Sequence, residues 1–499
     1  MASTKFYQSQ IGSGCVINYS YTDFPAKLLL KDLWYFFVYA WAVPLVLLPF
    51  RPCGSDDLDE LYMSFKNVFA LAVQALLTVL QLLFIFSLPL AFFFPLWMSG
   101  IGVIGFFALN FGLCMLLNSR NLEYVSDEKY AQDLPEHAHE HWVYLNGIAT
   151  GTHWHKNNLN RLALTFGRRV HGIHNRTSGI LFDLVECIIQ RNFCYATRDV
   201  RICYSILRGL LYNPNKTKII FILHSQGGIE GGLVLDWLLQ EMPQDLLSKL
   251  EVYTFGNAAN HFNNPHRHVV SQALEMLNPV AAIKTFFSEP SLSAPVVDRV
   301  DEKHGDDVAR FTLAAASKDT FASVSSSRTL IAAKDRAIGH IEHYAHTTDF
   351  VALWGVLHFA TNKRMSEQLP RFMGRLFSRS TGRGGHLLNH HYLDGMFPLK
   401  RDPKTGHLTG ADEENPFMEE TIGVDQEGDR MTQTREDFEI AYLNTEGLGN
   451  GDIATPPLKE AMRRRRSRGD VKVKEVSRLW SYRNGQSPSG YARNGSAAI

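Results

Sequence analysis

Two long stretches near the start of the chain carry no charged side chain. Residues 33–50 read LWYFFVYAWAVPLVLLPF, and residues 67–119 are mostly Leu, Phe, Ala, Ile and Val. A helix needs about 20 apolar residues to cross the hydrocarbon core of a bilayer. The second stretch is long enough for two crossings, divided near Ser99 and Gly100. The pattern therefore predicts two or three transmembrane helices within residues 33–119, preceded by an N-terminal segment over residues 1–32.

The middle of the chain, from about residue 135 to residue 400, alternates short apolar runs with runs of helical period. Strands are expected over residues 141–147, 168–175, 218–224, 250–257 and from 340 onward, and helices over 181–191, 198–211 and 229–242. This alternation predicts an α/β domain with a mainly parallel sheet covered by helices. Residues 265–335, rich in Ala, Ser and charged side chains, form an insertion that is either a lid or a solvated surface loop.

The last fifth of the chain, residues 401–499, loses the long apolar runs and is dominated by Gly, Asp, Glu, Asn and Arg. Such a composition cannot bury enough apolar surface to offset the entropy of ordering, so a disordered tail is expected. Over all 499 residues, 50 basic side chains balance 50 acidic ones, which argues against a nucleic-acid partner. Six cysteines without a CxxC pair exclude a disulfide scaffold and the common zinc ribbons, and we expect no metal.

The side of the membrane on which the domain lies stays open. Lys27 and Lys31 precede the first apolar run, and Arg51 and Lys66 follow it, so the positive-inside rule gives a near tie. We expect an integral, multi-pass protein of an endomembrane such as the endoplasmic reticulum. The glycosylation sequons at Asn175 and Asn215 would matter only if the domain were lumenal.

Ser225 carries the strongest chemical signal. It follows the apolar run 218–224 and precedes a helical run, in the order Leu223-His224-Ser225-Gln226-Gly227. A strand, a tight turn with Ser at its apex and a helix are typical of a nucleophile elbow, whose first helical amides can stabilise an oxyanion. Leu223 stands where the G-x-S-x-G pattern has its first Gly, and we expect a displaced helix to accommodate it. The alternative is a Ser in an ordinary strand-to-helix turn.

Four segments together resemble a known family. They are FILHSQGG (221–228), YTFGNAANHF (253–262), HYAHTTDFVALWGVLHF (343–359) and GHLLNHHYLDGMFPL (385–399). In this order they are similar to fungal membrane-anchored serine esterases of the α/β-hydrolase superfamily, which are distantly similar to the class 3 lipases. The resemblance covers residues 135–400. It implies an α/β-hydrolase fold, and ester hydrolysis by a Ser-acid-His triad without a metal or an organic cofactor.

The acid and the base of the implied triad follow Ser225 in the chain, since the order in α/β-hydrolases is Ser, then Asp or Glu, then His. Class 3 lipases carry the acid in a Thr-x-Asp-x-Val-like segment, which Thr348-Asp349-Phe350-Val351 matches, so the resemblance implies Asp349. Asp349 can equally cap the helix that follows it. His386, just after a Gly/Arg/Ser-rich loop, is the favoured base, and His391 is the alternative.

The oxyanion hole of this family uses the amide after the nucleophile and one from the loop after an early strand. These are Gln226 and either Gly147 or Ile148, although an ordinary strand-end turn would also explain Gly147. We therefore expect a membrane-anchored serine hydrolase that cleaves lipid or other hydrophobic esters through an acyl-enzyme. The lipid bilayer and the ester substrate are its expected partners. The alternative is a catalytically inactive membrane protein that uses the hydrolase fold as a binding or scaffold module.

Overall fold

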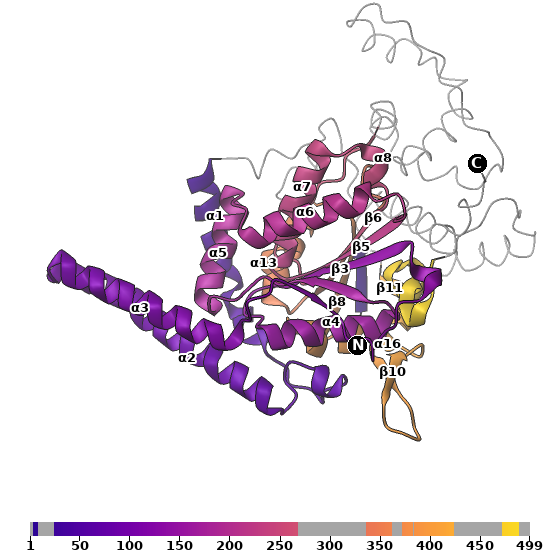
Figure 1. Ribbon diagram of the computed structural model, residues 1–499, viewed down its shortest axis with the longest axis horizontal. Helices are drawn as coiled ribbons and strands as arrows, with labels where there is room; N and C mark the ends of the chain where they lie inside the picture. The colour runs from indigo at the N-terminus through magenta and orange to yellow at the C-terminus, as the bar shows by residue number, and fades with distance from the viewer. Residues whose placement is uncertain are drawn as a thin grey trace, which may run out of the picture.

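A computed structural model describes residues 3–7, 24–267, 336–361, 372–382, 384–423 and 472–488. A nine-stranded sheet in the order β11-β1-β8-β7-β6-β5-β3-β4-β2 forms its centre (Figure 1). The strands are β1 (Ser3–Tyr7), β2 (Glu123–Val125), β3 (Glu140–Leu145), β4 (Val170–Ile173), β5 (Lys218–His224), β6 (Leu250–Phe255), β7 (His340–His346), β8 (Arg375–Ser380) and β11 (Ile422–Gly423). Neighbours from β4 to β8 are parallel, while β2 on β4 and β1 on β8 are antiparallel. The expectation of an α/β domain with a mainly parallel sheet is confirmed.

Helices cover both faces of the sheet, as the near-continuous apolar sequence of its central strand requires. Ile219, Phe221 and Leu223 of β5 enter one core, and Ile220 and Ile222 enter the other, because successive side chains point to opposite faces. The first core is closed by α6 (Arg198–Tyr212), α7 (Gly227–Glu241) and α13 (Phe350–Trp354), and the second by α4 (Thr152–Phe166) together with C-terminal segments.

Three N-terminal helices are long and apolar enough to cross a membrane. They are α1 (Pro25–Tyr39), continued by η2 (Ala40–Val46); α2 (Phe65–Ser87), continued by η4 (Leu88–Phe93); and α3 (Leu96–Leu117). In Figure 1, α2 and α3 form a hairpin that projects away from the sheet, whereas α1 lies along α5 (Ile180–Phe193).

Two expected boundaries of the apolar region are wrong. The hairpin turns at Phe94 and Pro95 rather than near Ser99, because Pro95 has no N–H for a continuing helix and its fixed φ suits a helix start. The first helix begins at Pro25 rather than near Leu33, so its first two turns include the charged side chains of Lys27 and Lys31.

Segments near both ends of the chain contribute to the domain. The expected disordered tail is wrong for residues 401–423 and 472–488, and residues 424–471 and 489–499 lie outside the described residues. Residues 3–7 form β1 inside the sheet. Residues 401–423 and 472–488 contribute β9 (Leu399–Arg401), β10 (Leu408–Ala411), α16 (Pro416–Glu419), β11, α19 (Val473–Val476) and η8 (Leu479–Gly485). Their buried side chains, such as Phe417, Trp480 and Tyr482, join the second core. Averaged composition concealed these few apolar clusters. Most of the insertion 265–335 lies outside the described residues.

Candidate active site

Ser225 forms the apex of a tight turn between β5 and α7. Its φ is +59°, a left-handed conformation that is uncommon for residues other than Gly and that a nucleophile elbow requires. Three backbone hydrogen bonds hold the turn: Ser225 N donates to Phe255 O (3.0 Å), and Ser225 O accepts from Gly228 N (2.9 Å) and Ala258 N (3.2 Å). The Ser225 side chain is therefore held rigidly above the end of the central strand.

Two glycines allow close backbone packing around the Ser225 turn. A Cβ at Gly147 would lie 2.3 Å from Ser225 Cβ, and one at Gly227 would lie 2.6 Å from Leu145 O. The first contact brings the loop after β3 directly against the serine, as an oxyanion hole built from this loop demands. The second allows α7 to start directly beside the end of β3.

Leu223 is accommodated by a glycine of α7, whereas the sequence had led us to expect a displaced helix. Its side chain is fully buried in the first core, and a Cβ at Gly231 would lie 2.4 Å from Leu223 Cδ1. The space that Gly supplies at the first position of the G-x-S-x-G pattern is supplied here by Gly231, one turn into the helix.

The structure brings Ser225, His386 and Asp349 into one chain of hydrogen bonds. His386 Nε2 lies 2.8 Å from Ser225 Oγ, and His386 Nδ1 lies 2.9 Å from Asp349 Oδ2. Asp349 directly precedes α13, and its Oδ1 accepts from Val351 N (2.8 Å). The same carboxylate thus caps the helix and contacts His386, so the two roles considered from the sequence coexist.

The charge state of Asp349 determines which groups donate and which accept in this series of hydrogen bonds. Burial alone would raise its pKa, but His386 and the hydrogen bonds from His386, Tyr392 and Val351 N hold the pKa of Asp349 below its usual value. Tyr392 Oη donates to Asp349 Oδ2 at 2.6 Å. An ionised carboxylate only accepts, so His386 carries its proton on Nδ1 and leaves Nε2 free to accept from the Ser225 hydroxyl.

His391, the alternative base, does not contact Ser225. Its Nε2 donates to Pro49 O (3.2 Å), and its Nδ1 accepts from Leu387 N (3.1 Å). Burial, together with neighbouring His390, lowers the pKa of His391 to about 3, so the ring is neutral at physiological pH. The geometry therefore favours His386 as the base.

His224 supports His386 from the strand side. The two rings stack with centroids 4.8 Å apart, and His224 Nε2 donates to His386 O (2.9 Å). Burial and the nearby His386 lower the pKa of His224 to about 3. A neutral His224 places no competing positive charge beside the imidazolium that a general base becomes.

The expected oxyanion amides lie beside Ser225. Asn146 Nδ2 donates to Gly147 O (2.9 Å), which fixes the Gly147–Ile148 peptide. Because N–H and C=O point in opposite directions across a trans peptide, the Ile148 N–H points away from Asn146. Within the described part of the chain, no hydrogen bond engages the amide N–H of Ile148 or of Gln226. Both donors are available to a ligand.

The Gln226 side chain is held by a buried polar network that sequence reasoning did not find. Gln226 Oε1 accepts from Asn175 Nδ2 (2.7 Å), and Gln226 Nε2 donates to Gln190 Oε1 (3.0 Å) and Glu186 Oε1 (3.1 Å). Asn175 Nδ2 also donates to Glu230 Oε1 (3.0 Å). Asn175 is therefore a buried structural side chain rather than a glycosylation acceptor. Its sequon was the only signal that drew attention to it.

The loop between α1 and α2 contacts the segment that carries His386. Glu60 Oε1 and Oε2 accept from the backbone N–H groups of Asn389 and His390, each at 3.0 Å, and Val46 O accepts from His386 N (3.3 Å). These contacts anchor the first turn of η7 (Leu388–Leu393), a π-helical turn just after His386. We call residues 46–60 the clasp. Nothing in the sequence pattern pairs it with residues 386–393.

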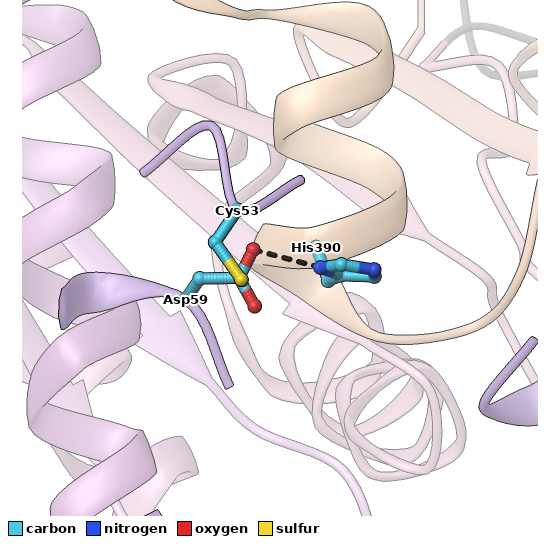
Figure 2. Close-up of side chains that lie close together, drawn as sticks. All are labelled: Cys53, Asp59 and His390. Atoms are coloured by element: carbon cyan, nitrogen blue, oxygen red, sulfur yellow. Dashed lines mark hydrogen bonds and ion pairs between the residues drawn. The ribbon is translucent and has the colours of Figure 1, made fainter. Parts of the chain in front are cut away.

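Within the clasp, Cys53 and Asp59 lie beside His390 (Figure 2), and the potential ligand atoms of the three residues lie within 4.8 Å of one another. His390 Nδ1 lies 2.8 Å from Asp59 Oδ2, and His390 Nε2 accepts from Arg51 N (3.2 Å). Burial and the neighbouring carboxylates raise the pKa of the Cys53 thiol to about 12. Both ring nitrogens are thus engaged and the thiol is protonated. The cluster joins the clasp to η7 through the contact between Asp59 and His390.

Comparisons with protein-family models, with curated proteins and with solved structures find no significant match.

Proposed function

We propose that the protein is a membrane-anchored serine hydrolase of the α/β-hydrolase superfamily that cleaves carboxylic esters. The observation that carries the proposal is the hydrogen-bonded chain from Ser225 Oγ through His386 to Asp349, at 2.8 and 2.9 Å, with Ser225 at a positive φ between strand and helix. The chain order Ser, Asp, His agrees with that superfamily.

In the proposed reaction, His386 Nε2 takes the Ser225 proton while Oγ attacks the ester carbonyl. Asp349 stabilises the imidazolium and keeps the other ring proton on Nδ1. The amides of Gln226 and Gly147 or Ile148 donate to the oxyanion of the tetrahedral intermediate. His386 then returns the proton to the leaving alcohol. Water activated by the same imidazole finally releases the acid from the acyl-enzyme.

A hydrophobic ester, such as a lipid, is the proposed substrate class. The catalytic histidine adjoins the end of the first apolar helix through the 3.3 Å bond from His386 N to Val46 O. The next residues, Leu47 and Leu48, are 44% and 37% exposed. Apolar groups therefore border the histidine on the side of the membrane helices, where an acyl chain would approach. Location in the endoplasmic reticulum remains a prediction from the sequence.

The test is labelling of the detergent-solubilised full chain with a fluorophosphonate probe, which reacts with activated serines. We expect the wild type and the surface variant Ser205→Ala to be labelled and Ser225→Ala to lose all labelling. Absence of labelling of a folded wild-type protein would favour a catalytically inactive binding or scaffold module. Labelling that persists in Ser225→Ala would mean that another residue is the nucleophile. A panel of short- and long-chain esters presented in mixed micelles then tests the substrate class.

A further inference from the structure

In Figure 1, α1, α5 and the α2–α3 hairpin lie on the same side of the molecule, and α5 contacts both α1 and α2. Each of these helices carries exposed apolar side chains. We infer that the protein is monotopic: α1, α5 and the outer half of the hairpin enter a bilayer from the same side, and the hairpin turn stays within the hydrocarbon. This topology replaces the multi-pass arrangement expected from the apolar runs. It does not depend on the catalytic proposal.

A stripe of polar side chains docks the N-terminal part of α2 on the domain. Asn67, Gln74 and Gln81 recur every seven residues, so they share one face of the helix. Asn67 Oδ1 accepts from Trp154 Nε1 (3.0 Å), Gln74 Nε2 donates to Ala149 O (3.0 Å), and Gln81 Nε2 donates to Ser178 O (2.8 Å). The domain therefore covers this face of α2 from its first turn to Gln81.

The domain segment along this stripe is too polar for hydrocarbon. Ser178 is exposed and Arg176 is half-exposed. A charged side chain and irregular backbone at membrane depth are tolerated only inside protein or in a water-filled cavity. The level of Gln81 therefore lies at or above the membrane surface on this side of the hairpin.

The arm beyond Gln81 is too short to cross. Residues 82–93 combine the end of α2 with η4, and at the rise per residue of α- and 3₁₀-helix they extend about 20 Å. The hydrocarbon core is about 30 Å thick. The arm passes the midplane and ends inside the bilayer.

The turn itself has the chemistry of a buried segment. Residues 87–99 read SLPLAFFFPLWMS without a charged side chain, and Phe92, Phe93 and Leu96 are 92%, 83% and 89% exposed. A crossing hairpin would present these side chains to water on the far side, which is unfavourable for so much apolar surface. The two serine hydroxyls donate inside the hairpin, from Ser87 to Phe84 O (2.7 Å) and from Ser99 to Ala91 O (3.0 Å).

The domain adds its own apolar face between the hairpin and α1. Val185, Ile189 and Phe193 of α5 are 40–50% exposed and recur every four residues, so they form one stripe on the helix. On α1 and its continuation η2, the exposed side chains include Trp34 and Trp41. A soluble domain does not need such an exposed stripe next to two other apolar surfaces, whereas a domain half-embedded in lipid does.

The opposite side of α1 faces the protein. Asp32 Oδ1 pairs with Arg191 Nη2 at 2.5 Å, and Asp32 Oδ2 accepts from Asn192 Nδ2 (2.8 Å). The ion pair is buried against the domain, and Arg191 also donates to Ala258 O (2.8 Å). A helix fastened to the domain in this way lies along it, with one side left for lipid.

Site-directed labelling in sealed vesicles tests the topology. The full chain carries either Phe93→Cys in the turn or Tyr212→Cys at the exposed end of α6, and each is compared with the wild type, which has its own cysteines. A membrane-impermeant maleimide is added outside, or admitted to the lumen through pores. We expect Tyr212→Cys to gain label from the domain side. Phe93→Cys should gain label from neither side and only after detergent is added.

Two outcomes would overturn the inference. Labelling of Phe93→Cys from the side opposite Tyr212→Cys would mean that the hairpin crosses the bilayer. Labelling from the same side in intact vesicles would mean that the turn lies outside it. Leu96→Cys gives a second reading of the same turn should Phe93→Cys fail to fold, and labelling in detergent shows that each introduced thiol is reactive.

Discussion

Leu223 occupies the space that any side chain at Gly231 would need. A Cβ at position 231 would lie 2.4 Å from Leu223 Cδ1, so the strand can carry a large residue before the nucleophile only because the helix carries none. The sequence thus departs from the G-x-S-x-G pattern, but the space that the first Gly of that pattern leaves is supplied at Gly231. The two positions are energetically coupled, which makes the relationship measurable.

The Leu223–Gly231 coupling predicts a compensated pair of variants. Gly231→Ala alone should destabilise the protein by about 1–3 kcal/mol through overpacking against Leu223. In the background Leu223→Ala, which leaves room for the added methyl group, Gly231→Ala should cost less than half of that amount. Thermal unfolding of the four proteins measures the interaction energy. Additive effects would mean that the two side-chain positions do not share this space.

The hydrogen bond from Tyr392 predicts a positioning effect on Asp349, the proposed catalytic acid. Tyr392→Phe removes the 2.6 Å hydrogen bond to Asp349 Oδ2 and keeps the ring, so the pKa of Asp349 should rise and the carboxylate should lose a contact that fixes its position against His386. A hydrogen bond to a charged group contributes about 1.5–3 kcal/mol, so we expect kcat to fall about tenfold or more. KM should change little, and the acidic limb of the pH profile should move to higher pH. An unchanged pH profile with a lower melting temperature would indicate a purely structural tyrosine.

The clasp predicts that the loop between the first two apolar helices controls catalysis. Glu60→Gln replaces one of the two accepting oxygens by an NH₂ group, which cannot accept from the backbone N–H of Asn389 or of His390. We expect kcat to fall about 3–30-fold at pH 8, as the loss of one such hydrogen bond allows. The matched control is Glu241→Gln, which alters a surface ion pair with Arg208 and should leave kcat unchanged. Equal kcat in both variants would argue against the clasp as a positioning device.

The raised pKa of Glu186 predicts that replacing this residue stabilises the protein in a pH-dependent way. Burial and the nearby acidic residues Asp199 and Asp183 raise the pKa of Glu186 to about 7. Because the unfolded chain loses this proton near pH 4.5, the contribution of Glu186 to stability is retained below that pH and is lost as the pH rises towards 7. Glu186→Gln keeps an accepting oxygen for Gln226 and removes the titration.

We therefore expect Glu186→Gln to raise the melting temperature at pH 8, by about 2–6 °C, and to raise it much less at pH 5. Differential scanning fluorimetry of variant and wild type at both pH values provides the comparison. If Glu186→Gln changes the melting temperature by the same amount at both pH values, this would contradict a raised pKa of Glu186.

Local patterns were sufficient for much of the domain. The five expected strands lie within one or two residues of β3, β4, β5, β6 and β7, because short β-branched runs between polar turns identify buried parallel strands. Ser225 could be singled out for the same reason, since its turn is defined by the residues directly around it. The apolar runs likewise predicted two or three N-terminal helices, of which the structure has three, although they did not predict the position of the hairpin turn.

Long-range contacts decided the remainder. The choice between His386 and His391 depends on which imidazole ring contacts Ser225. The two residues lie only five positions apart in the chain. Gly231 compensates for Leu223 across a strand–helix interface, and Glu60 reaches the backbone of residues 389 and 390. A sequence pattern records the local period and composition of the chain. It does not record which distant side chains share a volume, and for that reason the clasp, the elements formed by residues 401–423 and 472–488 and the polar network around Gln226 emerged only in three dimensions.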